Sequence, residues 1–163
     1  MKTLLSHPRN FFGLLSLFFV LSTIPAQAQE GAKIKLESLD RLAARASEVV
    51  NKEETTPDGG GMVYVRSFEF KQTGQYGESE VEEIRAQLRA PGWSRFMRVE
   101  DKDDPEGRET VEIYVFGKSK ESDIYAGMTI IVTEPKELTV VNIVGQGNVN
   151  QLMKQVKKNE APD

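Results

Sequence analysis

The sequence predicts an α+β protein, in which a mostly antiparallel sheet of about five strands carries packed helices and an N-terminal amphipathic helix. Three observations lead to this fold class. An apolar stripe with helical period runs from Leu36 to Val50, short runs rich in Val, Ile, Tyr and Phe occupy residues 62–144, and a second helical stripe covers 149–156. The 163 residues are 39% hydrophobic and 28% charged, which suits a folded domain and excludes a protein of many membrane spans.

The first 28 residues have the pattern of a secretory signal peptide. Lys2 and Arg9 precede an apolar run over 11–24, and Ala26 and Ala28 form the small-residue site that a signal peptidase accepts. The apolar run is shorter than the ~20 residues that a membrane-spanning helix needs. We therefore expect 1–28 to be removed, no transmembrane anchor after cleavage, and a periplasmic or secreted product.

The chemistry open to the mature chain is narrow. The sequence has no Cys, and its single histidine, His7, would leave with the signal peptide. Thiolate and imidazole are the usual nucleophiles, general bases and transition-metal ligands, so sites built on them are excluded. We expect no catalytic, cofactor-binding or metal-binding residues and no cofactor. The net charge of -4 argues against a nucleic acid as partner.

Residues 29–61 are predicted to be a helix followed by a flexible linker. The apolar side chains between Leu36 and Val50 share one face of a helix, with Glu37 and Arg41 on its polar side. Residues 51–61 are polar, contain Pro57 and end in three glycines. Such a segment would let the helix move independently of the rest of the chain.

Residues 62–158 are predicted to form the α+β domain, and 159–163 a disordered tail. The expected order is strand, helix, four strands, helix, with Ser79 and Glu82 forming a capping box at the start of the first helix. The expected strands are 62–70, 95–100, 110–116, 124–133 and 138–144, and the expected helices are 79–89 and 148–157.

Two loops resemble ligand-binding motifs without completing them. Residues 145–150 begin like a dinucleotide-binding fingerprint, but Asn150 stands where the third glycine belongs. Residues 101–112 are rich in carboxylates, ending with Glu112, but Pro105 and Glu106 occupy positions where a calcium loop needs an oxygen ligand and a glycine. We favour a tight turn for the first loop and a solvated acidic turn for the second, with calcium binding as its minor alternative.

Several polar residues stand out by their surroundings. Arg66 and Asn142 each stand at a position where the strand pattern calls for an apolar residue. A buried polar group without a hydrogen-bond partner lowers the stability of the fold by ~1–3 kcal/mol, so both should have partners. We expect an edge position for Arg66, and a bulge or a satisfied hydrogen-bond network for Asn142. A group of arginines near Trp93 is expected to pair with surface glutamates: Arg85, Arg89, Arg95 and Arg98.

The two strands at 124–133 and 138–144 are apolar on both sides, which is typical of strands buried on both faces of a sheet. We expect helices 79–89 and 148–157 to cover one face. The helix 36–50 would cover the other, either as a permanent core helix or as a detachable cover exchangeable for a partner segment or between the copies of a homodimer. The candidate interaction surface is Leu39, Leu42, Ala46, Val49, Tyr125, Ile131, Val141 and Ile143.

Three segments, 64–70, 87–95 and 134–145, together resemble domain of unknown function family 4252. Members of that family are small proteins of Gram-negative bacteria with signal peptides, and the resemblance covers Leu36 to Val156. It implies no established activity and no recognised catalytic residues. Family members carry a longer segment with an additional helix at the place where this chain has only 51–61.

The sequence thus predicts an exported envelope protein that is not an enzyme and that binds an unknown protein or envelope partner. Two alternatives stay open: a carboxylate-dependent hydrolase whose acids come from separate strands and turns, and an accessory component of envelope stress sensing. A cleft in which two acids converge with shifted pKa values would favour the hydrolase. A broad apolar groove would favour the binding module.

Overall fold

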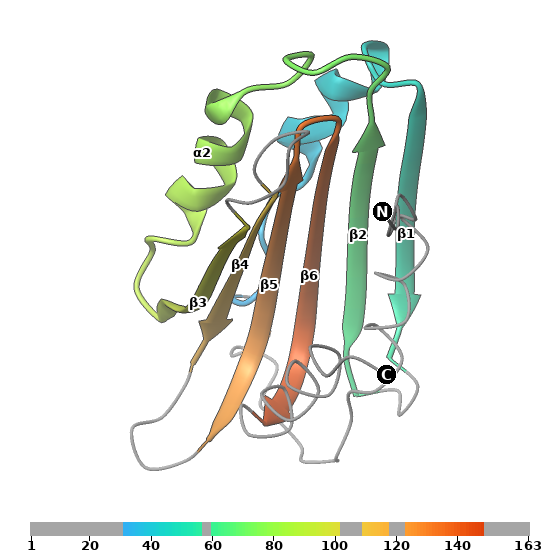
Figure 1. Cartoon of the computed structure of the whole chain (residues 1–163). Coiled ribbons are helices and arrows are strands. Elements are labelled where there is room, and N and C mark those ends of the chain that lie inside the picture. Colours follow the sequence, from blue (N-terminus) through green and yellow to red (C-terminus); the bar gives the residue numbers. More distant parts are fainter. Residues whose placement is uncertain (1–30, 57–59, 102–108, 118–122, 149–163) are drawn as a thin grey trace, which may run out of the picture.

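The computed structural model describes residues 31–56, 60–101, 109–117 and 123–148 (Figure 1). They form a six-stranded antiparallel sheet with strand order β1-β2-β6-β5-β4-β3 and two helices. The α+β class is therefore confirmed in its coarse form. The elements in chain order are the 3-10 helix η2 (Glu37–Ala44), β1 (Glu48–Thr55), β2 (Met62–Glu69), α2 (Glu78–Gln87), β3 (Trp93–Asp101), β4 (Glu109–Phe116), β5 (Ile124–Glu134) and β6 (Glu137–Asn148).

The sheet has two faces, each with its own core cluster. The first face carries both helices: Leu39 and Leu42 of η2 and Ile84 of α2 pack with Phe68 and Ile131 of the sheet. The cluster of the second face consists of strand residues, which are Val65, Ile113, Val115, Tyr125, Met128, Ile130, Val132, Val141 and Ile143. In Figure 1, α2 and η2 both lie toward the end of the sheet where β5 turns into β6.

The interpretation of 36–61 as a long helix and a linker is wrong in two respects. The helix is a 3-10 helix that ends at Ala44, and residues 48–55 form an edge strand paired with β2, with Val49 opposite Phe68. Val49 and Val50 fit a helical stripe and a strand equally well, and the unpaired edge of β2 offers them a full hydrogen-bond ladder. Charged residues at 52–54 are typical of an edge strand facing solvent.

The expected cover of the second face is also wrong. The helix η2 packs on the first face, beside α2, because only residues 45–47 connect it to β1. The Ser47 backbone N–H and hydroxyl both donate to the Glu69 carbonyl, which holds this short connection against the end of β2. A connection of this length cannot carry the helix around the sheet edge.

The candidate interaction residues do not share one face. In the register of β5 and β6, Ile131 is opposite Val140 and Ile130 is opposite Val141. Ile131 therefore lies on the first face, whereas Val141 and Ile143 lie on the second. Tyr125 joins the second face because the register shifts between Tyr125 and Gly127. A one-residue error in pairing moves a side chain to the opposite face.

Several expectations fall outside the described residues. They are the signal peptide with Ala26 and Ala28, most of the acidic turn, the helix 148–157 beyond Asn148, and the tail 159–163. The domain boundaries stay a prediction. In the part of the chain that the structure describes, no helix is long and apolar enough to span a membrane.

Candidate functional site

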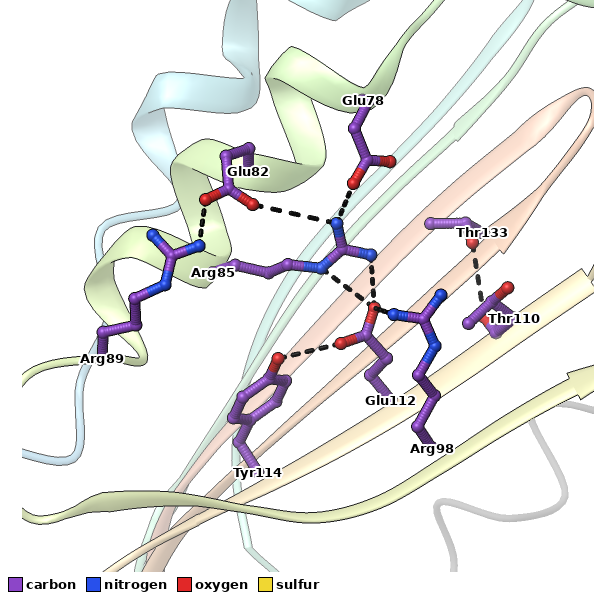
Figure 2. A network of polar contacts seen from close by, with 9 residues as sticks. All are labelled: Glu78, Glu82, Arg85, Arg89, Arg98, Thr110, Glu112, Tyr114 and Thr133. Carbon is purple, nitrogen blue, oxygen red and sulfur yellow. Dashed lines mark hydrogen bonds and ion pairs between the residues drawn. The ribbon is translucent and has the colours of Figure 1, made fainter.

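A polar cluster on the first face lies between α2 and strand β4 (Figure 2). The apolar side of α2, with Val81 and Ile84, packs on the sheet, and Arg85 follows directly at the margin of this contact. Strand β4 alternates, so that Thr110, Glu112 and Tyr114 share one side, and Glu112 faces the helix. Helix position and strand alternation together bring Arg85 onto Glu112.

Both carboxylate oxygens of Glu112 have donors. The Arg85 Nε donates to Glu112 Oε1 at 3.0 Å, and a second Arg85 nitrogen, Nη2, donates to the same oxygen. The Tyr114 hydroxyl donates to Glu112 Oε2 at 2.8 Å. Arg98 of β3, the cross-strand neighbour of Glu112, places its Nη1 at 3.9 Å from Oε1.

The outer part of the cluster consists of helix residues. Arg85 Nη1 also donates to Glu78 and lies 3.9 Å from Glu82, which accepts a hydrogen bond from Arg89. These glutamates and Arg89 are exposed to solvent, whereas the side chain of Glu112 is 1% exposed. The cluster thus runs from a buried carboxylate to the helix surface.

The electrostatics of the cluster favour the charged forms. Burial on its own would raise the pKa of Glu112, but hydrogen bonds from Arg85 and Tyr114 and the nearby arginine charges outweigh it, so the pKa is lowered. The same carboxylate raises the pKa of Arg85 against the effect of burial. Burial, then Glu112, raises the pKa of Tyr114. Glu112 is therefore an ionised, fully engaged carboxylate, whereas a general acid needs a raised pKa.

Asn142, at the centre of the first face, has the satisfied network that was one of its two expected states. Its side-chain oxygen accepts from the Ile34 backbone N–H at 3.2 Å. Its amide nitrogen lies 3.0 Å from the Ala32 carbonyl, 3.1 Å from Thr129 Oγ1 and 3.3 Å from the Met128 carbonyl. The side chain ties the N-terminal segment to β5 and β6.

Arg66 is not at an edge, because β2 lies between β1 and β6. Its side chain is 8% exposed, and its guanidinium lies 3.7 Å from Asp40 of η2 and 3.7 Å from Glu53 of β1. Nη1 donates to the Val65 carbonyl at 3.1 Å. Arg66 is thus a buried cation balanced by two exposed carboxylates from the flanking elements.

The arginines near Trp93 divide into different environments. Arg85 is buried against Glu112, which corrects the expectation of a surface pair, while Arg89 makes the expected surface pair with Glu82. Arg95 lies on β3 opposite Tyr114. Trp93 itself packs on Phe116, with ring centroids 5.3 Å apart. No single anion site forms from these residues.

Sequence reasoning considered Glu112 only as a calcium ligand and did not consider Tyr114. In the structure, Glu112 forms an ion pair with Arg85. The described residues contain no group of three acids that could hold a metal ion. The signal that could have found the pair is the alternation of β4. Thr110, Glu112 and Tyr114 form a polar row on a strand whose other side is apolar.

The eight candidate interaction residues are spread over three environments. Leu39, Leu42, Ala46 and Ile131 contribute to the first-face core, Tyr125, Val141 and Ile143 contribute to the second-face core, and Val49 is 43% exposed on β1. The structure therefore does not bring them together as one surface.

Comparison with known proteins places the chain in a family. No curated protein matches the chain. A family model described as a domain of unknown function, DUF4252, matches residues 58–155. This range includes strands β2 to β6 and α2, with the Arg85–Glu112 pair between them, but not η2 or β1. Because the match spans more than half of the chain, the protein belongs to the DUF4252 family.

Proposed function

We propose that the protein is an exported binding module of the bacterial envelope and has no catalytic chemistry of its own. The observation that carries this proposal is the state of the buried acids. Glu112 is neutralised by Arg85, and Glu80 has its pKa lowered to about 2, chiefly by the hydrogen bond from Arg45. A carboxylate hydrolase needs one acid with a raised pKa beside a second carboxylate. Both acids instead serve packing and helix capping.

The sheet edges support a binding role. The outer strands of the described sheet are β1 and β3, and an outer strand offers backbone groups to a partner strand. Strand β1 carries Glu48, Lys52, Glu53 and Glu54, and such charge discourages pairing. Strand β3 also carries four charged residues, but unlike β1 it lies within the family match, and its Val99 is 44% exposed. We infer that β3 is the edge at which a partner strand adds.

Export is supported by the sequence features of residues 1–28, namely the basic start, the apolar run and the small residues Ala26 and Ala28. Family membership is consistent with a small protein of the envelope. A periplasmic or secreted location fits a chain without cysteine, which needs no control of its redox state.

Crosslinking in the producing cell tests the proposal. A photo-reactive amino acid at Val99 should give an adduct with a discrete envelope component, whereas the same amino acid at Val49 should not. The two valines are matched, because they are 44% and 43% exposed and lie on opposite outer strands. An adduct at Val49 alone would move the binding edge to β1. No adduct, together with a hydrolytic activity that Glu112→Gln abolishes, would contradict the binding module.

A further inference from the structure

The second face of the sheet is a broad apolar surface made by strands β2 to β6. Its central residues are almost completely buried: Met128 is 0% exposed, and Val115 and Val141 are each 1% exposed. Partly buried residues extend it on both sides, with Val63 on β2 and Phe96 on β3. A continuous apolar surface that extends over five strands is rarely exposed to water in a soluble protein.

The described residues do not supply a second layer for this face. Ile34, Leu36, the core residues of η2 and those of α2 all belong to the first-face cluster, and the second-face cluster contains strand residues only. Neighbouring strands shield a side chain from the sides but leave its outer end exposed. Exposures near zero therefore require another layer packed on the sheet.

The chain itself leads onto this face. Strand β6 ends at Asn148, which is paired with Ile124 at the start of β5. Tyr125 of the second-face cluster lies at this end, opposite Gly147, and Ile143, opposite Met128, is the next cluster residue along β6. The next residues carry an apolar stripe at spacings of three and four: Val149, Leu152, Met153 and Val156.

We propose that residues 149–157 dock in cis on the second face as an amphipathic helix, over the side chains nearest the end of β6. A helix of this length is about 13 Å long, enough to cross two or three strands. The other side of the segment, with Lys154 and Lys157, is polar and suits solvent. The contact concerns the molecule's own architecture and does not depend on the partner strand inferred for β3.

The family match supports this occupant over residues 1–30, and the undescribed segments 102–108 and 118–122 contain no large apolar side chain. It ends at residue 155 and so includes Val149, Leu152 and Met153, whereas it leaves out residues 1–57. A segment within the family domain is the consistent source of a layer that this sheet requires. Residues 1–28 are expected to be removed on export.

Cysteine crosslinking tests the contact directly, because the chain has no cysteine of its own. Val63 and Tyr64 are neighbours on β2 that pack against the second-face and first-face clusters, respectively. With a short bis-maleimide, Val63→Cys/Leu152→Cys should crosslink within one chain, and Tyr64→Cys/Leu152→Cys should not. Crosslinking at Tyr64, crosslinking only between two chains, or no crosslinking of either pair would overturn the proposal.

Charge placed on the segment gives an independent test in the full chain. Leu152→Asp/Met153→Asp should release the segment, so that a hydrophobic dye binds and amide exchange in β5 and β6 becomes faster. Gln151→Asp/Gln155→Asp adds the same charge on the polar side of the predicted helix and should change neither. Equal effects of the two variants, or no effect of the first, would show that the apolar stripe does not cover the face.

Discussion

Glu112 has donors on both oxygens and almost no contact with solvent, so the consequences of removing it can be worked out from its partners. A buried ion pair gives little net stability compared with a well-packed apolar pair, because both charges lose their hydration. Removing one partner is different, since the other charge then stays buried without compensation. The pair therefore acts at this scale as a positional lock between α2 and β4.

Glu112→Ala should lower the free energy of unfolding by about 3 kcal/mol, because Arg85 and Tyr114 lose their buried acceptor. Glu82→Ala, which removes the surface partner of Arg89, should cost less than about 1 kcal/mol. Denaturant unfolding of the two variants measures the difference. Similar costs for both would mean that Arg85 finds another acceptor in the folded protein.

The pH dependence of stability has a residue-scale source in Glu80. Its carboxylate accepts hydrogen bonds from Arg45 and from the Gly77 N–H before α2, and its pKa falls from 4.5 to about 2. A lowered pKa in the folded state stabilises above the unfolded pKa, and this contribution is lost as pH falls toward the folded pKa. Glu80→Gln should therefore be less stable than wild type by about 1 kcal/mol near neutral pH.

The stability difference between wild type and Glu80→Gln should shrink between about pH 4.5 and pH 2. Arg45→Met removes the first cause of the shift, so an NMR titration of this variant should show the pKa of Glu80 closer to 4.5. A difference that grows as the solution becomes more acidic would contradict the assigned contacts.

At the scale of elements, Asn142 fastens the N-terminal segment across the centre of the first face. Asn142→Leu should lower the free energy of unfolding by about 2–3 kcal/mol, because the Ile34 N–H and the Ala32 carbonyl lose their partner while remaining buried. The Ile34 amide should also exchange faster. Thr129→Val, which removes one of the amide's acceptors, should cost less. Unchanged exchange at Ile34 in the Asn142 variant would show that packing alone holds the segment.

The elements also show where sequence patterns are enough to predict the secondary structure. The runs at 62–70, 110–116, 124–133 and 138–144 were correctly predicted as the strands β2, β4, β5 and β6, because they are short, rich in β-branched and aromatic residues, and show no competing helical period. The prediction for 36–55 was wrong because Val49 and Val50 fit the helical period as well as the alternation of a strand. A charged edge strand also has a composition similar to that of a linker. The α2 prediction was correct to within a few residues, but its cap is Glu80 on Gly77, two positions earlier than the Ser79 box would place it.

The candidate site was harder to predict from the sequence than the strands were. Arg85 and Glu112 lie 27 residues apart on different elements, and their contact depends on which turn of α2 lies over β4. The strand alternation indicates that Glu112 faces the first face, but not which cation it meets. The two-sided burial of β5 and β6 was predicted correctly, whereas the assignment of side chains to faces required the register and the irregularity near Tyr125.

At the scale of the whole molecule, the protein combines a sheet carrying helices on its first face with a second face for which we propose a cis-docked layer. Its outer strand β3 is the edge that we infer to be open to a partner. If the chain is exported, the mature protein recovered from the producing cell should begin at Gln29 by mass spectrometry. An intact Met1 terminus in the membrane fraction would contradict export with cleavage.

Our central claim is that the Arg85–Glu112 pair has a structural role, positioning α2 on β4, and that partner binding takes place elsewhere. Replacing the pair together, in Arg85→Met/Glu112→Leu, keeps similar volumes and leaves neither charge uncompensated. The most direct measurement is crosslinking from Val99 in this double variant, with circular dichroism to verify folding. We expect a folded protein and the same partner adduct as wild type. A folded variant that has lost the adduct would contradict the claim and make the Arg85–Glu112 pair the functional site.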